Sequence, residues 1–171
     1  MPDFPWPEVT VYRRIAATPA QVMAAYVDFG SQATYMPGLV ASRVVKRDGP
    51  GTFHVFYEYE VAGPNERYTV AVTVARAARG FQASWDLLVA RYARRLSGRL
   101  IVELDGGALV TYTSRVDPGT LGATFGTPES VSRRLQATVE ALAARVERLA
   151  AEQAADLADL VGELASIVDG R

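Results

Sequence analysis

The feature that most constrains this chain is a series of short strands joined by tight turns between Leu39 and Val116. Turn-forming residues cluster at four points in it, namely Asp48-Gly49-Pro50-Gly51, Gly63-Pro64-Asn65, the region around Gly80, and Asp105-Gly106-Gly107. Connections this short join antiparallel neighbours, because a parallel pair needs a crossover of a dozen or more residues. The stretch therefore predicts an antiparallel meander.

Alternation along the strands predicts which side chains point inward. In TFHVFYEYEVA (52–62), aromatic and apolar residues alternate with His54, Phe56, Glu58 and Glu60. Successive side chains of a strand lie on opposite faces, so the first set faces the core and His54 and both glutamates face outward. The alternation places these residues inside: Phe53, Val55, Tyr57, Tyr59, Val61, Tyr68, Val70, Val72, Val74, Phe81, Ala83, Trp85, Leu87, Leu96, Gly98, Leu100, Val102, Leu104, Val110, Tyr112, Ser114 and Val116.

Two helix starts flank the meander. After a first strand at Glu8–Ile15, Thr18 with Pro19 and Gln21 forms a capping box that opens a helix ending near Gly30, followed by one or two short turns before Pro37. A glycine-rich loop leads to a second start at 127–129, where threonine can cap and proline takes the first helical position.

The second helix is long and amphipathic, with apolar residues at Val131, Leu135, Val139, Leu142, Val146 and Leu149. A meander cannot bury its own apolar face, and this helix is the element long enough to cover it. We expect an α+β fold in which a curved antiparallel sheet of about six to seven strands wraps around the long helix, with short helices after the first strand.

These elements carry a family resemblance, found in the strand at 9–15 and in the segments Ala16-Ala17-Thr18-Pro19-Ala20-Gln21-Val22, Asp28-Phe29, Met36-Pro37, Gly98, Val110-Thr111-Tyr112 and Val116-Asp117-Pro118. Across about residues 8 to 148 the chain resembles the polyketide cyclase/dehydrase and lipid-transport group of the START-like, Bet v 1-like superfamily (SRPBCC). The resemblance implies a helix-grip fold with a cavity between sheet and long helix, which relatives use for lipids, sterols, quinones and polyketides.

The inner face is rich in side chains with a polar tip: Tyr57, Tyr59, Tyr68, Trp85, Tyr112 and Ser114. Each buried hydroxyl or indole N–H needs a hydrogen-bond partner. A mostly apolar wall with a few convergent polar groups is typical of a small-molecule site. We expect these six residues to line a ligand cavity; the alternative is that the rings fill the core and bond to the backbone.

Candidates for catalysis are few. The alternation admits Arg94 to the inner face, where a guanidinium can hold a carboxylate or an enolate oxygen, but a local bulge beside Arg95 would place it on the surface. If the protein is an enzyme, Tyr112 and Arg94 are its candidate catalytic residues. His54 is the only histidine and cysteine is absent, which argues against a catalytic triad, a thiolate nucleophile or a multi-histidine metal site. We expect no metal and no cofactor.

Three functions stay open. The first is a binding protein, acting as a carrier, chaperone or sensor for a hydrophobic small molecule such as a lipid, quinone or polyketide. The second is a polyketide aromatase/cyclase or dehydratase that uses tyrosine and arginine in the same cavity. The third is a protein-interaction module acting through the C-terminal helix. We favour the first, because the sequence supplies a cavity but no convincing catalytic set.

Charge and hydropathy restrict the partners. With 18 basic and 19 acidic side chains, the net charge is −1, which gives little of the phosphate attraction that nucleic-acid binding needs. No apolar stretch reaches about 18 residues, and the start MPDFPWPE has neither the basic nor the apolar region of a leader. We expect no nucleic-acid partner, no stable membrane insertion, and a bacterial cytoplasmic protein.

The chain continues past the helix that should cover the sheet. We place a START-like domain at residues 1–148 and an acidic amphipathic helical extension at 149–171, in which residues 150–170 carry five acidic and no basic side chains. Its apolar residues keep helical spacing through Leu157, Leu160, Leu164 and Ile167. A straight helix would overhang the domain, so this stripe needs cover. We favour a second copy, giving a homodimer; a break near Ala150–Ala155 with folding back, or a solvated tail, are the alternatives.

Overall fold

The computed structural model describes residues 6–61, 63–121 and 127–170. Its elements are β1 (Val9–Ile15), α1 (Pro19–Val27), the 3-10 helix η1 (Phe29–Thr34), β2 (Leu39–Gly49), β3 (Thr52–Tyr59), β4 (Glu66–Ala77), β5 (Gly80–Ala90), β6 (Arg95–Leu104), β7 (Ala108–Asp117), the 3-10 turn η2 (Gly119–Leu121), α3 (Pro128–Glu152) and α4 (Ala154–Asp169). The predicted glycine-rich loop includes residues 122–126, and the predicted domain and extension include 1–5, 62 and 171; these lie outside the described residues.

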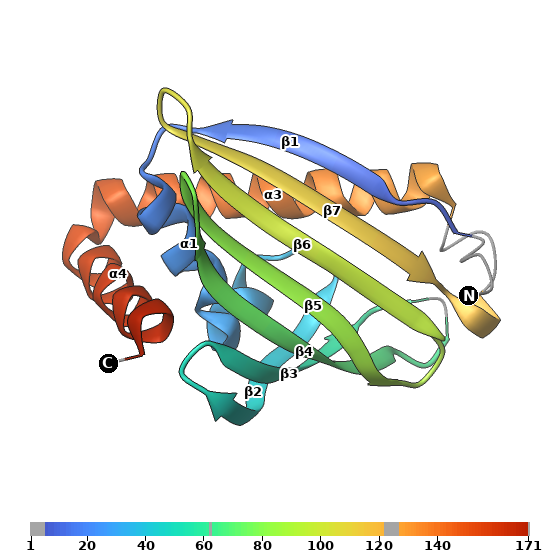
Figure 1. Ribbon diagram of the computed structural model, residues 1–171. Coiled ribbons are helices and arrows are strands. Elements are labelled where there is room, and N and C mark those ends of the chain that lie inside the picture. Colours follow the sequence, from blue (N-terminus) through green and yellow to red (C-terminus); the bar gives the residue numbers. More distant parts are fainter. Residues whose placement is uncertain (1–5, 62, 122–126, 171) are drawn as a thin grey trace.

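The sheet has seven antiparallel strands in the order β1-β7-β6-β5-β4-β3-β2. From β2 to β7, each strand pairs with the next one along the chain, as the short turns predict. The first strand returns to the opposite edge, where Val11 pairs with Tyr112. Figure 1 shows the sheet curving along α3. The predicted helix-grip architecture is therefore confirmed.

Both predicted helix starts are present. At α1, the Thr18 Oγ1 accepts from the Gln21 N–H at 3.1 Å, and the Gln21 Oε1 accepts from the Thr18 N–H at 3.1 Å. At α3, the Thr127 Oγ1 accepts from the Ser130 N–H at 3.1 Å, and Pro128 takes the first helical position. These side chains bond to backbone donors that have no partner inside a helix.

The core lies between the concave face of the sheet and α3. All six predicted apolar residues of α3 are buried, and so is most of the predicted inner face. Leu104 is an error of the prediction: it is the last residue of β6 and is 57 % exposed. Val61 and Glu60 follow the end of β3 at Tyr59, so the strand alternation does not extend to them.

The C-terminal extension folds back on the domain. The long helix breaks at Gln153 (φ −140°, ψ 49°), and α4 packs on α1 and reaches β4. Leu157 and Leu164 are 2 % and 1 % exposed, and Asp169 makes two ion-paired hydrogen bonds with Arg76, at 2.9 and 3.0 Å. The overhanging straight helix that favoured a homodimer does not form. The predicted boundary at residues 148/149 lies inside α3.

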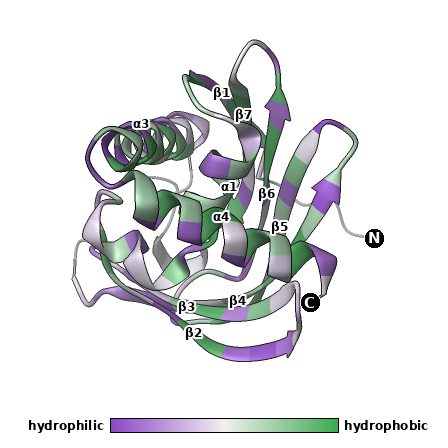
Figure 2. Ribbon diagram, turned by 90° about the vertical axis from the view of Figure 1, so that its left-hand side faces the viewer, coloured by the Kyte–Doolittle hydropathy of each residue, from purple (hydrophilic) through white to green (hydrophobic). Residues whose placement is uncertain are grey.

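α1 and α4 together close one end of the fold. Figure 2 looks at this end and shows both helices between α3 and strands β3 and β4. Among the described helices, none is long and apolar enough to span a membrane.

The covered face of α4 generates a stability prediction. Replacing Leu164 with alanine should lower the free energy of unfolding by about 3 kcal/mol, because a buried leucine loses its contacts and leaves a void. Leu104→Ala is the control and should change it by less than about 0.5 kcal/mol, because that side chain is exposed. Urea unfolding of both variants measures the difference. A midpoint that rises with protein concentration would contradict cover by the same chain and point to a second copy.

Candidate functional site

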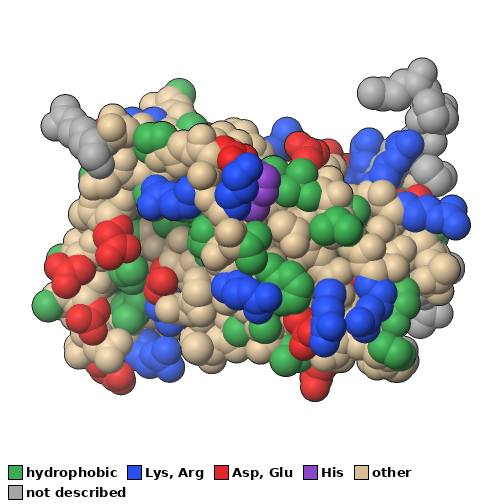
Figure 3. Space-filling view, turned by 90° about the horizontal axis from the view of Figure 1, so that it is seen from below, with side chains coloured by type: hydrophobic (Ala, Val, Ile, Leu, Met, Phe, Trp, Pro, Cys, Tyr) green, Lys and Arg blue, Asp and Glu red, His purple; other side chains and the backbone are tan. Residues whose placement is uncertain are grey.

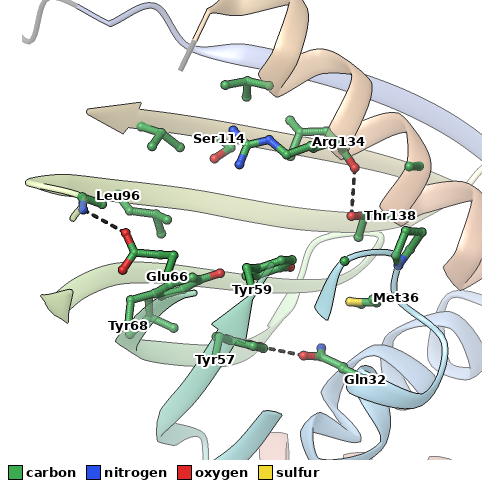
Figure 4. A pocket seen from close by; sticks show the side chains of 18 of the residues that line it. Gln32, Met36, Tyr57, Tyr59, Glu66, Tyr68, Leu96, Ser114, Arg134 and Thr138 are labelled. Carbon is green, nitrogen blue, oxygen red and sulfur yellow. Dashed lines mark hydrogen bonds between the residues drawn. The ribbon is translucent and has the colours of Figure 1, made fainter. Parts of the chain in front are cut away.

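A cavity of about 400 Å³ lies between the inner face of the sheet and the first half of α3. Figure 4 shows its wall from close by. All six residues predicted from the sequence line it: Tyr57, Tyr59, Tyr68, Trp85, Tyr112 and Ser114. The remaining wall is mostly apolar and comes from η1 and the segment after it, β4, the β5–β6 turn, β7 and α3.

The absence of a side chain at Gly98 leaves room for the indole of Trp85. Gly98 lies on β6 and pairs with Trp85 on β5 and with Ser114 on β7. A Cβ atom at Gly98 would lie 2.5 Å from the indole Cζ2 of Trp85, closer than two carbons can approach. The indole also contacts Tyr112 and Tyr26, with ring centroids 5.5 and 6.3 Å apart. Gly98 therefore allows the largest side chain of the wall to lie flat against β6.

The tyrosines of β3 and β4 form a layered aromatic wall. Tyr68 stacks on Tyr59 with centroids 5.9 Å apart and planes 3° apart, and it lies 5.4 Å from the ring of Tyr57. The Tyr57 hydroxyl donates to the Gln32 Oε1 at 2.7 Å (Figure 4). The Gln32 Nε2 in turn donates to the Tyr26 carbonyl at 2.8 Å. This chain of bonds fixes the Tyr57 ring from the side of η1.

Gln32 was missed by sequence reasoning because a 3-10 turn carries no strong periodicity. It is 1 % exposed and both ends of its amide are bonded. Its position just after an apolar helix is the one signal that sequence offers.

Glu66 was also missed by sequence reasoning. It holds the β5–β6 turn, which contributes to the cavity wall. Its carboxylate is buried and accepts from the backbone N–H groups of Arg91, Tyr92 and Ala93 at 3.0 to 3.2 Å. Backbone donors arranged around a carboxylate form charge-assisted hydrogen bonds. Glu66 thereby holds the β5–β6 turn, which supplies Ala93 to the cavity wall.

Arg134 is the charged group that α3 contributes to the interior. It is half-buried, and Figure 4 shows its side chain extending from α3 toward Ser114 on β7. Burial lowers the pKa of Arg134, and the nearby phenols of Tyr59, Tyr68 and Tyr112 oppose that shift. Sequence reasoning missed this arginine, although it follows Val131 by three residues and so shares the buried face of the helix.

Arg94 lies on the surface, which is one of the two positions that the sequence left open for it. It is exposed in the turn between β5 and β6, where its backbone N–H donates to the Asp117 carbonyl at 3.0 Å. The turn, and not a local bulge, interrupts the strand alternation that admitted it to the inner face. The inward position is therefore excluded, and the candidate catalytic role of Arg94 loses its basis.

His54 and the strand glutamates lie away from the interior or at its edge. His54 is on the outer face, with its Nε2 2.6 Å from an Asp48 carboxylate oxygen, and Figure 3 shows the histidine among basic side chains on that surface. Glu58 pairs with Arg67 on the outer face, as predicted for its direction. Glu60 is exposed but lines the cavity mouth, which the prediction did not anticipate.

Among the described residues, no three His, Cys, Asp or Glu side chains come together as metal ligands.

The cavity tyrosines are neutral phenols at neutral pH. Burial raises the pKa of Tyr26, Tyr57, Tyr59, Tyr68 and Tyr112 above the ordinary range, and in each except Tyr59 repulsion from neighbouring tyrosines adds to the effect. A neutral phenol donates a hydrogen bond, and it does not accept a proton as a base. The wall therefore offers hydrogen-bond donors.

The raised pKa values predict loss of stability at high pH. Burial raises the pKa of six tyrosines in the folded chain: Tyr26, Tyr35, Tyr57, Tyr59, Tyr68 and Tyr112. Unfolded tyrosines ionise near pH ~10, so their contribution to stability is present below that pH and is lost as the pH rises above it. Urea unfolding should show a steep fall above about pH 10 that is shallower in Tyr68→Phe. Identical pH profiles for the two proteins would contradict the buried phenols.

The chain is similar to known proteins in sequence and in fold. A family model described as "Polyketide cyclase / dehydrase and lipid transport" matches residues 7–147. A search of curated proteins gave no match. Among solved structures, TTHA0849 from Thermus thermophilus is 19 % identical with a TM-score of 0.73, covering 86 % of this chain and 100 % of that one.

Two other solved structures carry functional descriptions. A STAR-related lipid transfer protein from Xanthomonas axonopodis is 20 % identical with a TM-score of 0.71, covering 86 % of this chain and 89 % of that one. The ZhuI aromatase/cyclase from Streptomyces sp. R1128 is 21 % identical with a TM-score of 0.63, covering 84 % and 95 %. At this identity the structures establish a shared fold. With the family model matching most of its length, the chain belongs to the polyketide cyclase/dehydrase and lipid transport family.

Proposed function

We propose that this protein binds a hydrophobic small molecule, such as a lipid, quinone or polyketide, in the cavity under α3 and acts as its carrier, chaperone or sensor. The observation that carries the proposal is the cavity wall. At about 400 Å³ the cavity falls in the usual range of small-molecule sites, roughly 300 to 1,000 Å³. Its wall combines apolar side chains with a few hydroxyls and one half-buried guanidinium, which is typical of such sites.

The chemistry of the wall supports binding more than bond breaking. The phenols stay protonated near neutral pH, and the Glu66 carboxylate accepts from three backbone N–H groups. The phenols can donate hydrogen bonds to a ligand, whereas the Glu66 carboxylate accepts from the backbone of the chain itself. Proton abstraction requires a base. We therefore place ligand binding by Tyr57, Tyr59, Tyr68, Trp85, Tyr112 and Ser114 ahead of catalysis.

A cyclase or dehydratase is the second candidate, and one observation favours it. Tyr112 and Arg134 both line the cavity, where a phenol and a guanidinium can stabilise the negative charge that develops on an enolate oxygen. A reactive poly-keto chain needs positioning above all. The family description and the aromatase/cyclase among the structural neighbours agree with this alternative.

The remaining expectations from the sequence stay predictions. A cytoplasmic location is one of them. A homodimer or an interaction role through the C-terminal helix is another, and it would have to use the exposed side of α4, because Leu157 and Leu164 are buried against the chain's own domain.

Dye binding tests the proposed function. An environment-sensitive apolar dye should bind the folded protein and be displaced by decanoate, and Trp85→Ala should weaken dye binding about tenfold, because an indole contributes a large contact area. The matched control is Val89→Ala on the same strand, whose side chain is exposed and which should change dye affinity by less than about twofold. A folded protein that binds no dye, or equal losses in the two variants, would count against a cavity ligand.

Tyr112 separates the carrier from the enzyme. With a linear poly-keto substrate, followed by chromatography and mass spectrometry, the carrier proposal predicts the same products and rates as buffer, and Tyr112→Phe should change ligand affinity by less than about fivefold. An enzyme would accelerate the reaction, and Tyr112→Phe would then lower kcat by about a hundredfold with little change in KM, because that hydroxyl acts mainly in the transition state. The second result would replace the carrier proposal with the cyclase.

A further inference from the structure

The charges around the cavity are distributed unevenly. Within the part of the chain that the structure describes, four charged residues line it, namely Glu60, Glu66, Arg133 and Arg134. Glu60 and Arg133 are exposed. Arg134 therefore brings a positive charge into the interior, while the negative charge of Glu66 is directed at the β5–β6 turn.

Arg134 lies among groups that donate hydrogen bonds. Its neighbours on the wall include the hydroxyls of Ser114, Tyr59 and Tyr112, and the phenols are protonated. A guanidinium has five N–H donors in a planar fork and no acceptor, so it adds further donors to the same region. A region of the wall with a cation and several hydroxyl donors is complementary to an anionic oxygen, and the fork matches the two oxygens of a carboxylate.

The rest of the wall is suited to an apolar chain. Away from Arg134, the cavity is bounded by Val70, Val72, Trp85, Met36 and Leu135, which offer carbon surface to a ligand. A ligand that meets both regions has an acidic head and an apolar body.

The β5–β6 turn adds positive charge outside the cavity. Arg91 and Arg94 are exposed in this turn, next to Ala93, which lines the wall. Surface arginines do little for affinity, but a cluster near a site raises the local concentration of anions. The arginine-rich segment between 76 and 99 thus has a role consistent with an acidic ligand.

We propose that the ligand is an amphipathic carboxylic acid, whose carboxylate binds the guanidinium of Arg134 while its apolar body lies against the aromatic wall. This inference rests on the proposed binding function and narrows the class of its ligand. It makes Arg134 the residue that selects an acid over a neutral molecule of the same length.

Calorimetric titration with decanoate and decanol at neutral pH tests this selection. The two probes share the apolar chain and differ in the charge of the head. Decanoate should bind the folded protein at least about tenfold more tightly than decanol, because a charge-assisted pair to a carboxylate is stronger than a neutral hydrogen bond. Arg134→Gln should remove about tenfold of the decanoate affinity and leave decanol affinity within about twofold.

Two further variants keep the test interpretable. Arg148→Gln removes an exposed arginine of α3 that is not among the residues lining the cavity and should leave both affinities within about twofold. Arg134→Lys keeps the charge without the fork and should retain more decanoate affinity than Arg134→Gln. Circular dichroism and thermal unfolding check that each variant is folded.

The outcomes separate the inference from the proposed function. Equal affinities of decanoate and decanol for the wild-type protein would overturn selection by charge while the binding function stands. Equal losses for both probes in Arg134→Gln, or an equal loss of decanoate binding in Arg148→Gln, would also overturn it. If neither probe binds the folded protein, the proposed function fails and this inference fails with it.

Discussion

The contact between α3 and the concave face of the sheet determines the rest of this structure. Along its second half, Leu142, Val146 and Leu149 are buried, and Arg145 pairs with Asp28 at 3.0 Å with a side chain that is 10 % exposed. Along its first half, Arg134 and Thr138 line the cavity instead. The second half of the helix is thus buried in the core while its first half bounds the cavity, so this one helix accounts for both.

The two ends of the fold consequently differ. α1 and α4 cover the end where α3 is tightly packed, and the pairing of Asp169 with Arg76 ties the last turn of α4 to β4. Figure 3 shows acidic side chains gathered toward one end of the face it presents. At the other end, Glu66 holds the β5–β6 turn, which supplies Ala93 to the cavity wall.

Strand alternation predicted the fold and the strand side of the cavity from the sequence. Period-two patterning is robust where one face of a strand is buried, so Tyr57, Tyr68, Trp85 and Ser114 reach the wall as expected. The pattern failed where strands end: Leu104 is exposed and Arg94 lies in a turn. Alternation is defined only while the ladder continues, and strand ends are set by tertiary contacts.

Residues on helices and turns were the harder part of the site. Gln32 bonds to the Tyr57 side chain and Glu66 to the backbone of Arg91, each 25 residues away, which no local pattern encodes. Arg134 is different, because its spacing from Val131 places it on the buried face of α3. The break at Gln153 lies in the segment that the sequence offered as an alternative to a straight helix. Composition could not select it, since glutamine is a good helix former; it accompanies the burial of Leu157 and Leu164 and the packing of α4 on α1.

The most direct test of the account is to locate a bound ligand. Nuclear Overhauser contacts from isotope-labelled decanoate to the assigned protein report which side chains lie within a few ångströms of it. The account predicts contacts from the chain of the ligand to Trp85 and Tyr68 and from its head to Arg134. Contacts confined to exposed outer-face residues such as Leu88 and Val89 would contradict it, because the ligand would then lie outside the cavity between the sheet and α3.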